Sequence, residues 1–230
     1  MPVSEPKVPK TVLLLGATGL VGSQCLHRFL QDDHFADVVT LTRKPLEAAA
    51  ASAGYRNDVI DFEIPDSYRD KVVADLVVCA LGTTIKKAGS RKNFRRVDFD
   101  YALALARAAR EAGAQHFLLV SAKGASVTSR FFYNRVKGEL EAAVAEIGYK
   151  RLSIFRPSLL KGDRREFRAG EEFGNFLAGA LSFVIPRQWQ PTPVGHLADA
   201  ILAAARIGVP GKKIYESGPI LTGLDPETDG

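Results

Sequence analysis

The segment Thr11–Cys25, TVLLLGATGLVGSQC, constrains the fold of this 230-residue chain more than any other. An apolar run, Val12–Leu15, predicts a buried strand and stops at Gly16. Two more glycines, Gly19 and Gly22, follow at intervals of three residues. Beyond them the apolar residues take helical spacing, which places on one helix face Gly22, Cys25, Leu26, Phe29 and Leu30. The segment therefore predicts a strand, a tight glycine turn and a helix that begins at once.

A turn of this kind forms a seat for a pyrophosphate, because the N–H groups of the first helical turn face the anion. We expect Gly16 to allow the tight turn, Gly19 to let the backbone approach the phosphates, and Gly22 to let helix and strand pack closely. The expected seat consists of Gly16, Ala17, Thr18, Gly19, Leu20, Val21 and Gly22. The spacing is G-x-x-G-x-x-G rather than the standard G-x-G-x-x-G, so the alternative is a glycine-rich turn of another α/β protein.

The second expected strand, Asp37–Thr42, is followed by a basic pair, Arg43 and Lys44. In dinucleotide-binding folds an acidic residue near this point accepts hydrogen bonds from the ribose 2′-hydroxyl, and a carboxylate would repel a 2′-phosphate. A guanidinium can instead bind that phosphate through two parallel hydrogen bonds. The pair therefore favours NADP(H) over NAD(H), the alternative being that both side chains belong to a solvated loop.

Strand and helix patterns alternate along the chain, which predicts a doubly wound, mostly parallel α/β sheet of the Rossmann type with helices on both faces. The further expected strands are Asp58–Asp61, Asp75–Cys79, His116–Val120, Ile154–Arg156 and Lys213–Tyr215. The expected helices are Gly22–Gln31, Ser67–Lys71, Asp98–Ala112, Phe131–Ile147 and Leu197–Arg206. We expect one NAD(P)-binding domain over residues 11–218, with a substrate-side insertion at 161–193 and tails at 1–10 and 219–230.

The composition is that of an ordinary soluble domain, with 31 basic and 26 acidic residues and a formal net charge of +5. The stretch Thr83–Arg96 is locally basic, but we interpret it as a solvated loop or an electropositive rim for an anionic cofactor rather than a nucleic-acid site. Cys25 and Cys79 are expected to be buried free thiols, and no metal site is expected. With no signal peptide visible and no apolar run long enough to span a bilayer, the expected location is the cytoplasm.

A candidate catalytic pair lies at the start of the helix expected over Phe131–Ile147. Tyr133 and Lys137 stand four residues apart and share a helix face. A lysine ammonium beside a phenol lowers the pKa of the phenol, which can then donate a proton to a developing alkoxide or accept one in reverse. Ser121 follows the strand His116–Val120, where ligands bind in parallel sheets, and can orient a substrate carbonyl toward Tyr133. The alternatives are a structural Tyr/Lys pair and a turn serine.

Together, the glycine turn, Arg43, Ser121 and the Tyr133/Lys137 pair resemble the short-chain dehydrogenase/reductase superfamily. The closer resemblance is to its atypical branch, the Tat-interacting-protein-like oxidoreductases. It is carried, between residues 11 and 166, by the segments LLLGATGLVG, VIDFE, CALGTTIKKAGS, FRRVDFDYALALA, HFLLVSAKGA, FYNRVKGELE and LSIFRPSLLKGDRRE.

The resemblance implies roles for further residues. Asp61 and Phe62 would lie beside the adenine. The segment Leu81, Gly82 and Thr83 would pass behind the cofactor. The nicotinamide would be bordered by Arg156, Pro157 and Leu159. Asp98 stands in the helix where many relatives place a catalytic asparagine, and it therefore departs from the usual four-residue proton relay.

These features predict an NADP(H)-dependent oxidoreductase that transfers a hydride between NADPH and an unidentified small-molecule carbonyl or alcohol. The alternative is a catalytically silent NADPH-binding sensor or regulator that acts through a protein partner, a role also attributed to the family that the chain resembles. A nucleic-acid binder, suggested by the basic stretch alone, is a third and less favoured interpretation.

Overall fold

A computed structural model describes residues 10–46, 52–161 and 191–222. The strands of its main sheet are β1 Lys10–Leu15, β2 Phe35–Thr42, β3 Tyr55–Val59, β4 Leu76–Cys79, β5 His116–Val120, β6 Arg151–Arg156 and β9 Gly211–Glu216. They lie in the order β3-β2-β1-β4-β5-β6-β9, and every neighbouring pair is parallel. Two short strands, β7 Leu160–Lys161 and β8 Thr192–Pro193, pair separately.

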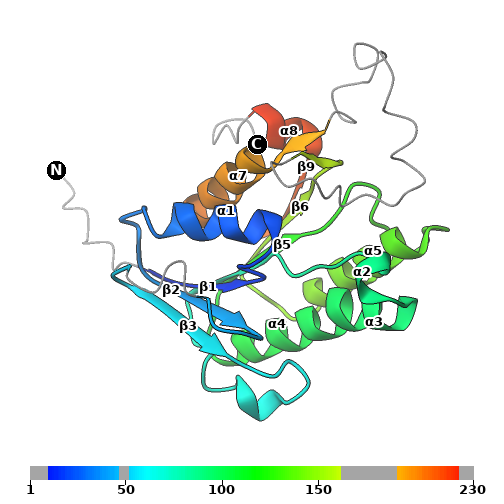
Figure 1. Ribbon diagram of the computed structural model, residues 1–230. Coiled ribbons are helices and arrows are strands. Elements are labelled where there is room, and N and C mark those ends of the chain that lie inside the picture. Colours follow the sequence, from blue (N-terminus) through cyan, green and yellow to red (C-terminus); the bar gives the residue numbers. More distant parts are fainter. Residues whose placement is uncertain (1–9, 47–51, 162–190, 223–230) are drawn as a thin grey trace.

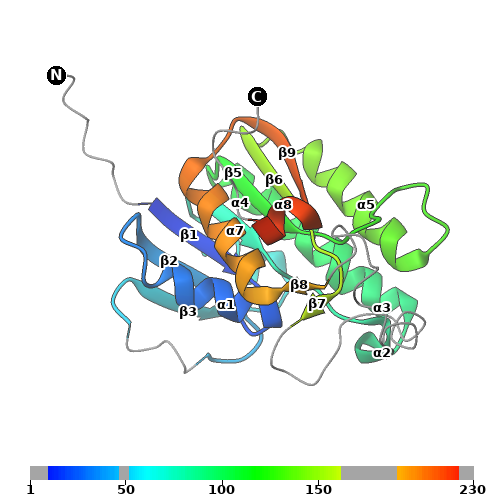
Figure 2. The same cartoon turned by 90° about the horizontal axis from the view of Figure 1, so that it is seen from above.

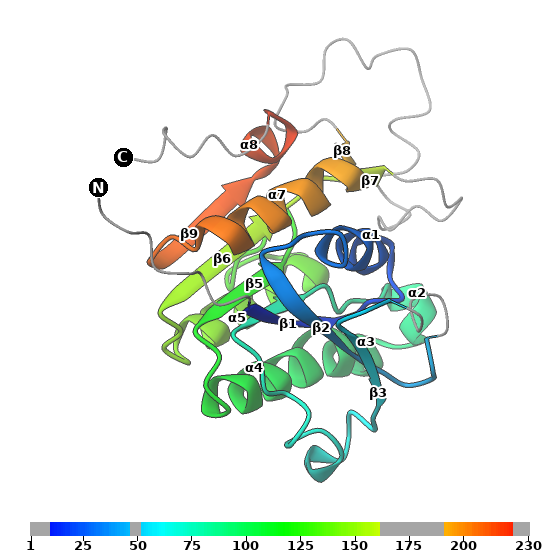
Figure 3. The same ribbon diagram turned by 90° about the vertical axis from the view of Figure 1, so that its left-hand side faces the viewer.

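Helices cover both faces of this sheet (Figure 1). One face carries α1 Leu20–Phe29, α7 Val194–Ile207 and α8 Ser217–Thr222, and the other carries α4 Ala102–Glu111 and α5 Phe132–Ala145 (Figure 3). The shorter helical segments are η2 Pro65–Ser67, α2 Ile85–Ala88, α3 Arg91–Arg95 and the π-helical turn η3 Arg96–Tyr101. The predicted doubly wound Rossmann sheet is therefore confirmed, and all of its strand pairs are parallel.

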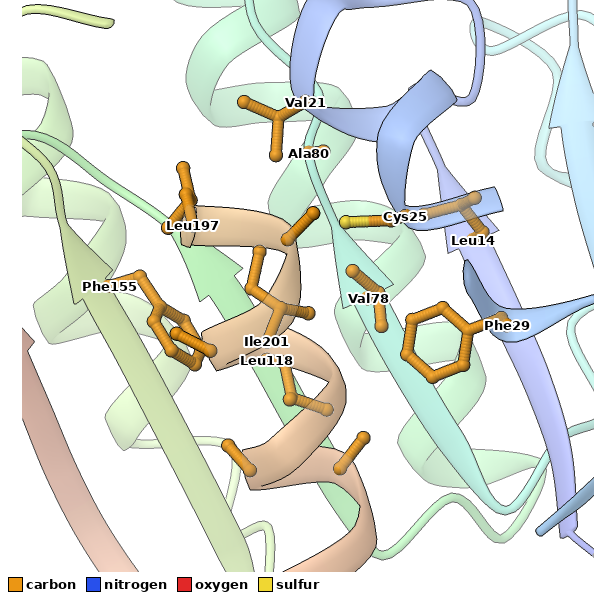
Figure 4. Close-up of a cluster of buried hydrophobic side chains, with 14 of the residues drawn as sticks. Leu14, Val21, Cys25, Phe29, Val78, Ala80, Leu118, Phe155, Leu197 and Ile201 are labelled. Atoms are coloured by element: carbon orange, nitrogen blue, oxygen red, sulfur yellow. The ribbon is translucent and has the colours of Figure 1, made fainter. Parts of the chain in front are cut away.

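Alternation along the central strands divides the hydrophobic core into two layers. In β1, Val12 and Leu14 face the layer under α1 and α7, whereas Leu13 and Leu15 face the layer under α4 and α5. Figure 4 shows the first of these layers, in which Ile201 of α7 lies among side chains of the central strands and of α1. Burial on both faces explains why β1 and β4 are continuous apolar runs rather than alternating ones.

Two glycines set how closely α1 packs on β1. A Cβ added at Gly22 in α1 would lie 2.0 Å from the carbonyl oxygen of Gly16, which is closer than atoms can approach. Gly16 itself has a φ of +85°, and a Cβ there would lie 2.6 Å from the carbonyl oxygen of Ala80. Only glycine satisfies both positions, so the strand can turn into the helix without displacing β4.

The edge strand β3 differs from its expected position at Asp58–Asp61, because β3 spans Tyr55–Val59. Its polar side chains explain the error. The Asn57 amide donates to the hydroxyls of Thr40 and Thr42 in β2, each at 2.9 Å. The strand is therefore held by side-chain hydrogen bonds as well as by its backbone, and apolar patterning gave no signal for it.

The prediction of a loop over Thr83–Arg96 is wrong, because most of this stretch is helical. Thr84 caps α2 by accepting the N–H of Lys87 at 3.1 Å, and Ser90 caps α3 by accepting the N–H of Asn93 at 3.1 Å. Such serine and threonine caps favour helix starts even in a very basic stretch. The helix expected to begin at Asp98 consequently begins at Arg91.

Smaller differences concern element ends. The expected helix Ser67–Lys71 is replaced by the single turn η2, and the residues after Gly218, expected as loop, continue α8 as far as Thr222. Strands β6 and β9 and helix α7 each begin two or three residues earlier than expected. The expected insertion at 161–193 and the expected tails lie almost wholly outside the described residues.

We expect Gly22→Ala to lower the free energy of unfolding by about 3 kcal/mol or more, because the new methyl group would displace backbone rather than a side chain. Gly195→Ala in α7 is the matched control, since its Cβ would meet only the end of the Arg28 side chain, at 3.3 Å. Urea unfolding of both variants measures the difference. Equal stability of the two variants would contradict this account of the turn.

Candidate active site

The amino end of α1 lies at the carboxyl end of β1 and is the first part of the site. Gly19 precedes the helix, no side chain caps it, and its first turn contains no acidic residue. The N–H groups of this turn and the positive end of the helix dipole therefore favour an anion. Because no Cβ fits at Gly16 or Gly22, the turn packs tightly against the backbone, as the predicted pyrophosphate seat requires.

Arg43 and Lys44 come directly after β2, whose carboxyl end lies beside that of β1. Both side chains are exposed, and neither has a hydrogen-bond or ion-pair partner among the described residues. An unpaired guanidinium next to a phosphate cradle fits the expected contact with a 2′-phosphate.

Asp61 and Phe62 follow the next strand along, β3, as the predicted adenine contacts require. The Asp61 carboxylate accepts the N–H of Glu63 at 2.9 Å, so it closes a tight turn. Phe62 packs on the ring of Tyr101 with 5.5 Å between centroids. This half-buried aromatic pair offers a flat apolar surface at the outer end of the site.

A cavity of about 70 Å³ lies at the carboxyl ends of β4, β5 and β6. Of the expected site residues it brings together Val21, Leu81, Gly82, Thr83, Ser121, Tyr133, Lys137 and Pro157. Its other lining residues, which were not among those expected, are Ala80, Asp98, Val120, Ala122, Ser158 and Leu160. Arg156, the last residue of β6, and Leu159, which follows the strand, do not line it.

Tyr133 and Lys137 enter the cavity from the first two turns of α5. Tyr133 is half-buried, and its ring packs on Phe94 of α3 with 5.5 Å between centroids. Lys137 is buried, and its Nζ lies 2.8 Å from Oδ1 of Asp98. Burial lowers the pKa of this lysine, but Asp98 and the nearby Tyr133 and Cys79 outweigh burial, so that the pKa is raised overall.

Ser121 lies at the cavity, but its hydroxyl donates a hydrogen bond to Oε1 of Glu141. The same carboxylate accepts two hydrogen bonds from Arg156, at 3.0 and 2.6 Å, and Arg156 also reaches Glu216 at 3.2 Å. The hydrogen bonds that Arg156 donates to Glu141 raise the pKa of Arg156. With its proton bound to Glu141, Ser121 can accept a hydrogen bond in the cavity but cannot donate one.

Glu141 is a residue that the sequence analysis missed. It lies four residues after Lys137 and eight after Tyr133, on the same face of α5. This spacing is the signal that points to it. The carboxylate is buried and accepts hydrogen bonds from Ser121 and Arg156, so it joins β5, α5 and β6 behind the cavity.

Both cysteines are buried free thiols, as expected. Burial raises the pKa of Cys25 to about 12 and that of Cys79 to about 11, so neither is a thiolate at neutral pH. Among the described residues, no group of three or more histidine, cysteine, aspartate or glutamate side chains is arranged to hold a metal ion.

Comparison with known proteins identifies the family. A family model described as NAD(P)H-binding matches residues 16–152, more than half of the chain. The chain belongs to the NAD(P)H-binding family. The matched span contains the glycine turn, Arg43, Tyr133 and Lys137.

Several curated proteins align with most of the length of this chain. The rat protein HTATIP2 is 40% identical over 182 residues, which are 78% of this chain and 73% of the relative. The mitochondrial protein fmp52 of Emericella nidulans is 35% identical over 178 residues, 75% of this chain and 76% of the relative. The mitochondrial protein FMP52 of Candida albicans is 31% identical over 214 residues, 88% of this chain and 90% of the relative.

Solved structures show the same fold at low sequence identity. An oxidoreductase of the short-chain dehydrogenase/reductase family from Burkholderia thailandensis aligns with a TM-score of 0.66 at 18% identity, covering 94% of each chain. A short-chain dehydrogenase from Burkholderia cenocepacia in complex with NADP aligns with a TM-score of 0.64 at 16% identity, covering 97% of this chain and 95% of the other.

The relatives contradict the expected cytoplasmic location, because several fungal ones are named mitochondrial. The expectation failed because the absence of a secretory signal says nothing about mitochondrial targeting, whose signals have a different composition. In the part of the chain that the structure describes, no helix combines the length and apolar character that crossing a membrane demands.

We expect Glu141→Ala to lower the free energy of unfolding by about 3 kcal/mol, because it removes a buried carboxylate and leaves the half-buried Arg156 with only Glu216 as a partner. Glu139→Ala, on the same helix, is the matched control. Glu139 pairs with Arg95 and Arg135 nearer the surface, so its loss costs about 1 kcal/mol or less. Chemical unfolding compares the two, and a similar cost for both would refute the structural role of Glu141.

Proposed function

We propose that this protein is an NADP(H)-dependent oxidoreductase that interconverts a carbonyl compound and an alcohol. The observation that supports the proposal most is the cavity in which Tyr133, Lys137 and Ser121 meet, at the strand ends next to the glycine turn. Membership of the NAD(P)H-binding family supports binding of the nucleotide, and the cavity contains an acid, Tyr133, beside the expected position of the nicotinamide.

The nucleotide would lie along the carboxyl edge of the sheet. In this proposal, the amino end of α1 binds the pyrophosphate, and Asp61 with Phe62 flanks the adenine. Arg43 and Lys44 bind the 2′-phosphate, because both are exposed cations at the end of β2. The segment that follows β4 passes behind the nucleotide and contributes Leu81, Gly82 and Thr83, which line the cavity.

The chemistry that bound NADPH supplies is a hydride delivered to the carbonyl carbon. Tyr133 donates its phenolic proton to the carbonyl oxygen, which becomes the hydroxyl of the alcohol product. In the reverse direction the phenolate removes that proton. Lys137 lies one helical turn along α5, and its ammonium favours the phenolate electrostatically.

Ser121 takes a more limited role than a carbonyl-binding donor. Because its proton is bound to Glu141, its oxygen is available to the cavity only as an acceptor. We therefore assign Ser121 to orienting the substrate in its alcohol form, or a donor group elsewhere on the substrate. Tyr133 is then the donor that polarises the carbonyl.

The second candidate function is a sensor that binds NADPH without turnover. The hydrogen bond from Ser121 to Glu141 favours the sensor, because this bond occupies a donor that a reductase site would use. The half-buried Tyr133 at the cavity favours the reductase, since nucleotide binding alone does not require an acid there.

Replacing Tyr133 with phenylalanine separates the two functions. For a reductase, Tyr133→Phe should lower NADPH oxidation in the presence of aldehydes and ketones by about 100-fold or more, while NADPH affinity changes little. Tyr55→Phe is the control, because its hydroxyl bonds to Thr40 of β2 and neither residue lines the cavity. Full turnover by Tyr133→Phe would eliminate Tyr133 as the acid, and NADPH binding without oxidation by the unaltered protein would favour the sensor.

Arg43→Ala tests which nucleotide is bound. Loss of a charge-assisted contact with the 2′-phosphate should weaken NADPH binding by about 10- to 100-fold and leave NADH binding nearly unchanged. Arg56→Ala is the control, because that exposed arginine pairs with Asp58 at 2.9 Å on β3. Calorimetric titration with both nucleotides measures the effect, and equal losses for NADPH and NADH would exclude the assignment.

A further inference from the structure

Asp98 lies in an irregular turn of a long helix. The helical segment from Arg91 to Glu111 is interrupted by the π-helical turn η3, which contains Asp98. A π-turn inserts an extra residue into a helix and occurs frequently at functional sites. This turn packs against α5, the helix that carries Lys137, and Figure 1 shows α3, α4 and α5 on the same side of the sheet.

The surroundings of Asp98 fix both of its carboxylate oxygens. Oδ2 accepts the N–H of Thr83 at 2.8 Å, and Oδ1 lies 2.8 Å from Nζ of Lys137. The side chains of Asp98 and Lys137 are only 1% and 4% exposed. A Cβ added at Gly82 would lie 3.3 Å from Oδ1, so a glycine allows the chain behind the cavity to pass this close to the ion pair.

A buried lysine tends to lose its proton unless an opposite charge holds it. Three groups facing the Lys137 ammonium raise its pKa, namely Asp98 from η3, Tyr133 from α5 and Cys79 from β4. Cys79 has its pKa raised to about 11 by burial and is neutral at physiological pH. Asp98 therefore provides the full negative charge that offsets the burial of Lys137.

We propose that Asp98 is a positioning residue whose carboxylate keeps the buried Lys137 ammonium charged and in place beside Tyr133. Its effect on turnover rests on the proposed function, whereas the ion pair is testable without turnover. An asparagine at this position would keep the hydrogen bond from Thr83 but lose the charge. The residue therefore does more than fill the turn.

The first test measures stability against pH. In the unaltered protein the pKa of Lys137 lies above its ordinary value of 10.5, so its stabilising effect is complete below that value and is lost only at more alkaline pH. In Asp98→Asn, burial dominates and the folded-state pKa falls below 10.5, so the unfolded state binds more protons. The stability of this variant should therefore increase with pH.

Urea unfolding between about pH 6.5 and about pH 9.5 shows this as a folding equilibrium constant that rises about tenfold or more relative to the unaltered protein. Asp100→Asn is the matched control, because Asp100 lies exposed on the same turn. The stability of this variant should change with pH as that of the unaltered protein does. The double variant Asp98→Asn, Lys137→Met should lose the pH dependence. A pH-independent difference for Asp98→Asn would overturn the proposal.

The second test measures turnover against pH. As pH rises, Lys137 of Asp98→Asn loses its proton and no longer favours the Tyr133 phenolate. The turnover of the variant, divided by that of the unaltered protein, should therefore fall about tenfold or more across the same range. A constant ratio would mean that Asp98 has only a structural role, and it would overturn the proposed effect of Asp98 on turnover. If the unaltered protein has no turnover, the proposed function fails, and the stability measurement still decides whether Asp98 keeps Lys137 charged.

Discussion

The contact between the backbone of Gly16 and the Cα of Gly22 sets α1 against the end of β1, and the rest of the site depends on it. Because no Cβ intervenes, the amino end of the helix reaches the carboxyl edge of the sheet without pushing β4 away. Every strand of the main sheet is parallel, so the segments that follow β1 to β6 all emerge at this one edge. Figure 2 shows the sheet from above, behind α1 and α7. The glycine turn, the basic pair after β2 and the cavity after β4 to β6 are thus brought to one edge of the sheet by topology, before any side chain contributes.

Two ion pairs then give the cavity its chemistry. Asp98 holds Lys137 on one side, and Glu141 holds Arg156 and the Ser121 hydroxyl on the other. Such pairs add little net stability, since desolvation offsets their attraction, but each one fixes side chains that would otherwise have several rotamers. Between them, Tyr133 is left half-buried at the cavity. In this arrangement the neighbouring charges and the Ser121 hydroxyl are already paired, and for that reason the proposed function takes its proton donor from Tyr133.

The parts predictable from sequence are those that depend on local pattern. The turn of Gly16 to Gly22, the buried strands β1, β4 and β5, and the shared face of Tyr133 and Lys137 follow from spacing alone, and the structure confirms the fold that they imply. The parts that could not be predicted depend on contacts between distant segments. The bond of Ser121 to Glu141 needs β5 and α5 to be packed together, and the contact of Asp98 with Lys137 needs the π-turn to be packed against α5. The edge strand β3 was misplaced because side-chain hydrogen bonds from Asn57, not apolar burial, hold it.

The central claim is that one phosphorylated dinucleotide spans this edge, with its 2′-phosphate at Arg43 and its reactive ring at the Tyr133 cavity. A crystal structure of the protein grown with NADP⁺ tests it most directly. The account predicts pyrophosphate density at the amino end of α1, the 2′-phosphate in contact with the Arg43 guanidinium, and the nicotinamide ring at the cavity beside Tyr133. A nicotinamide that points away from Tyr133, or a 2′-phosphate that makes no contact with Arg43, would contradict it.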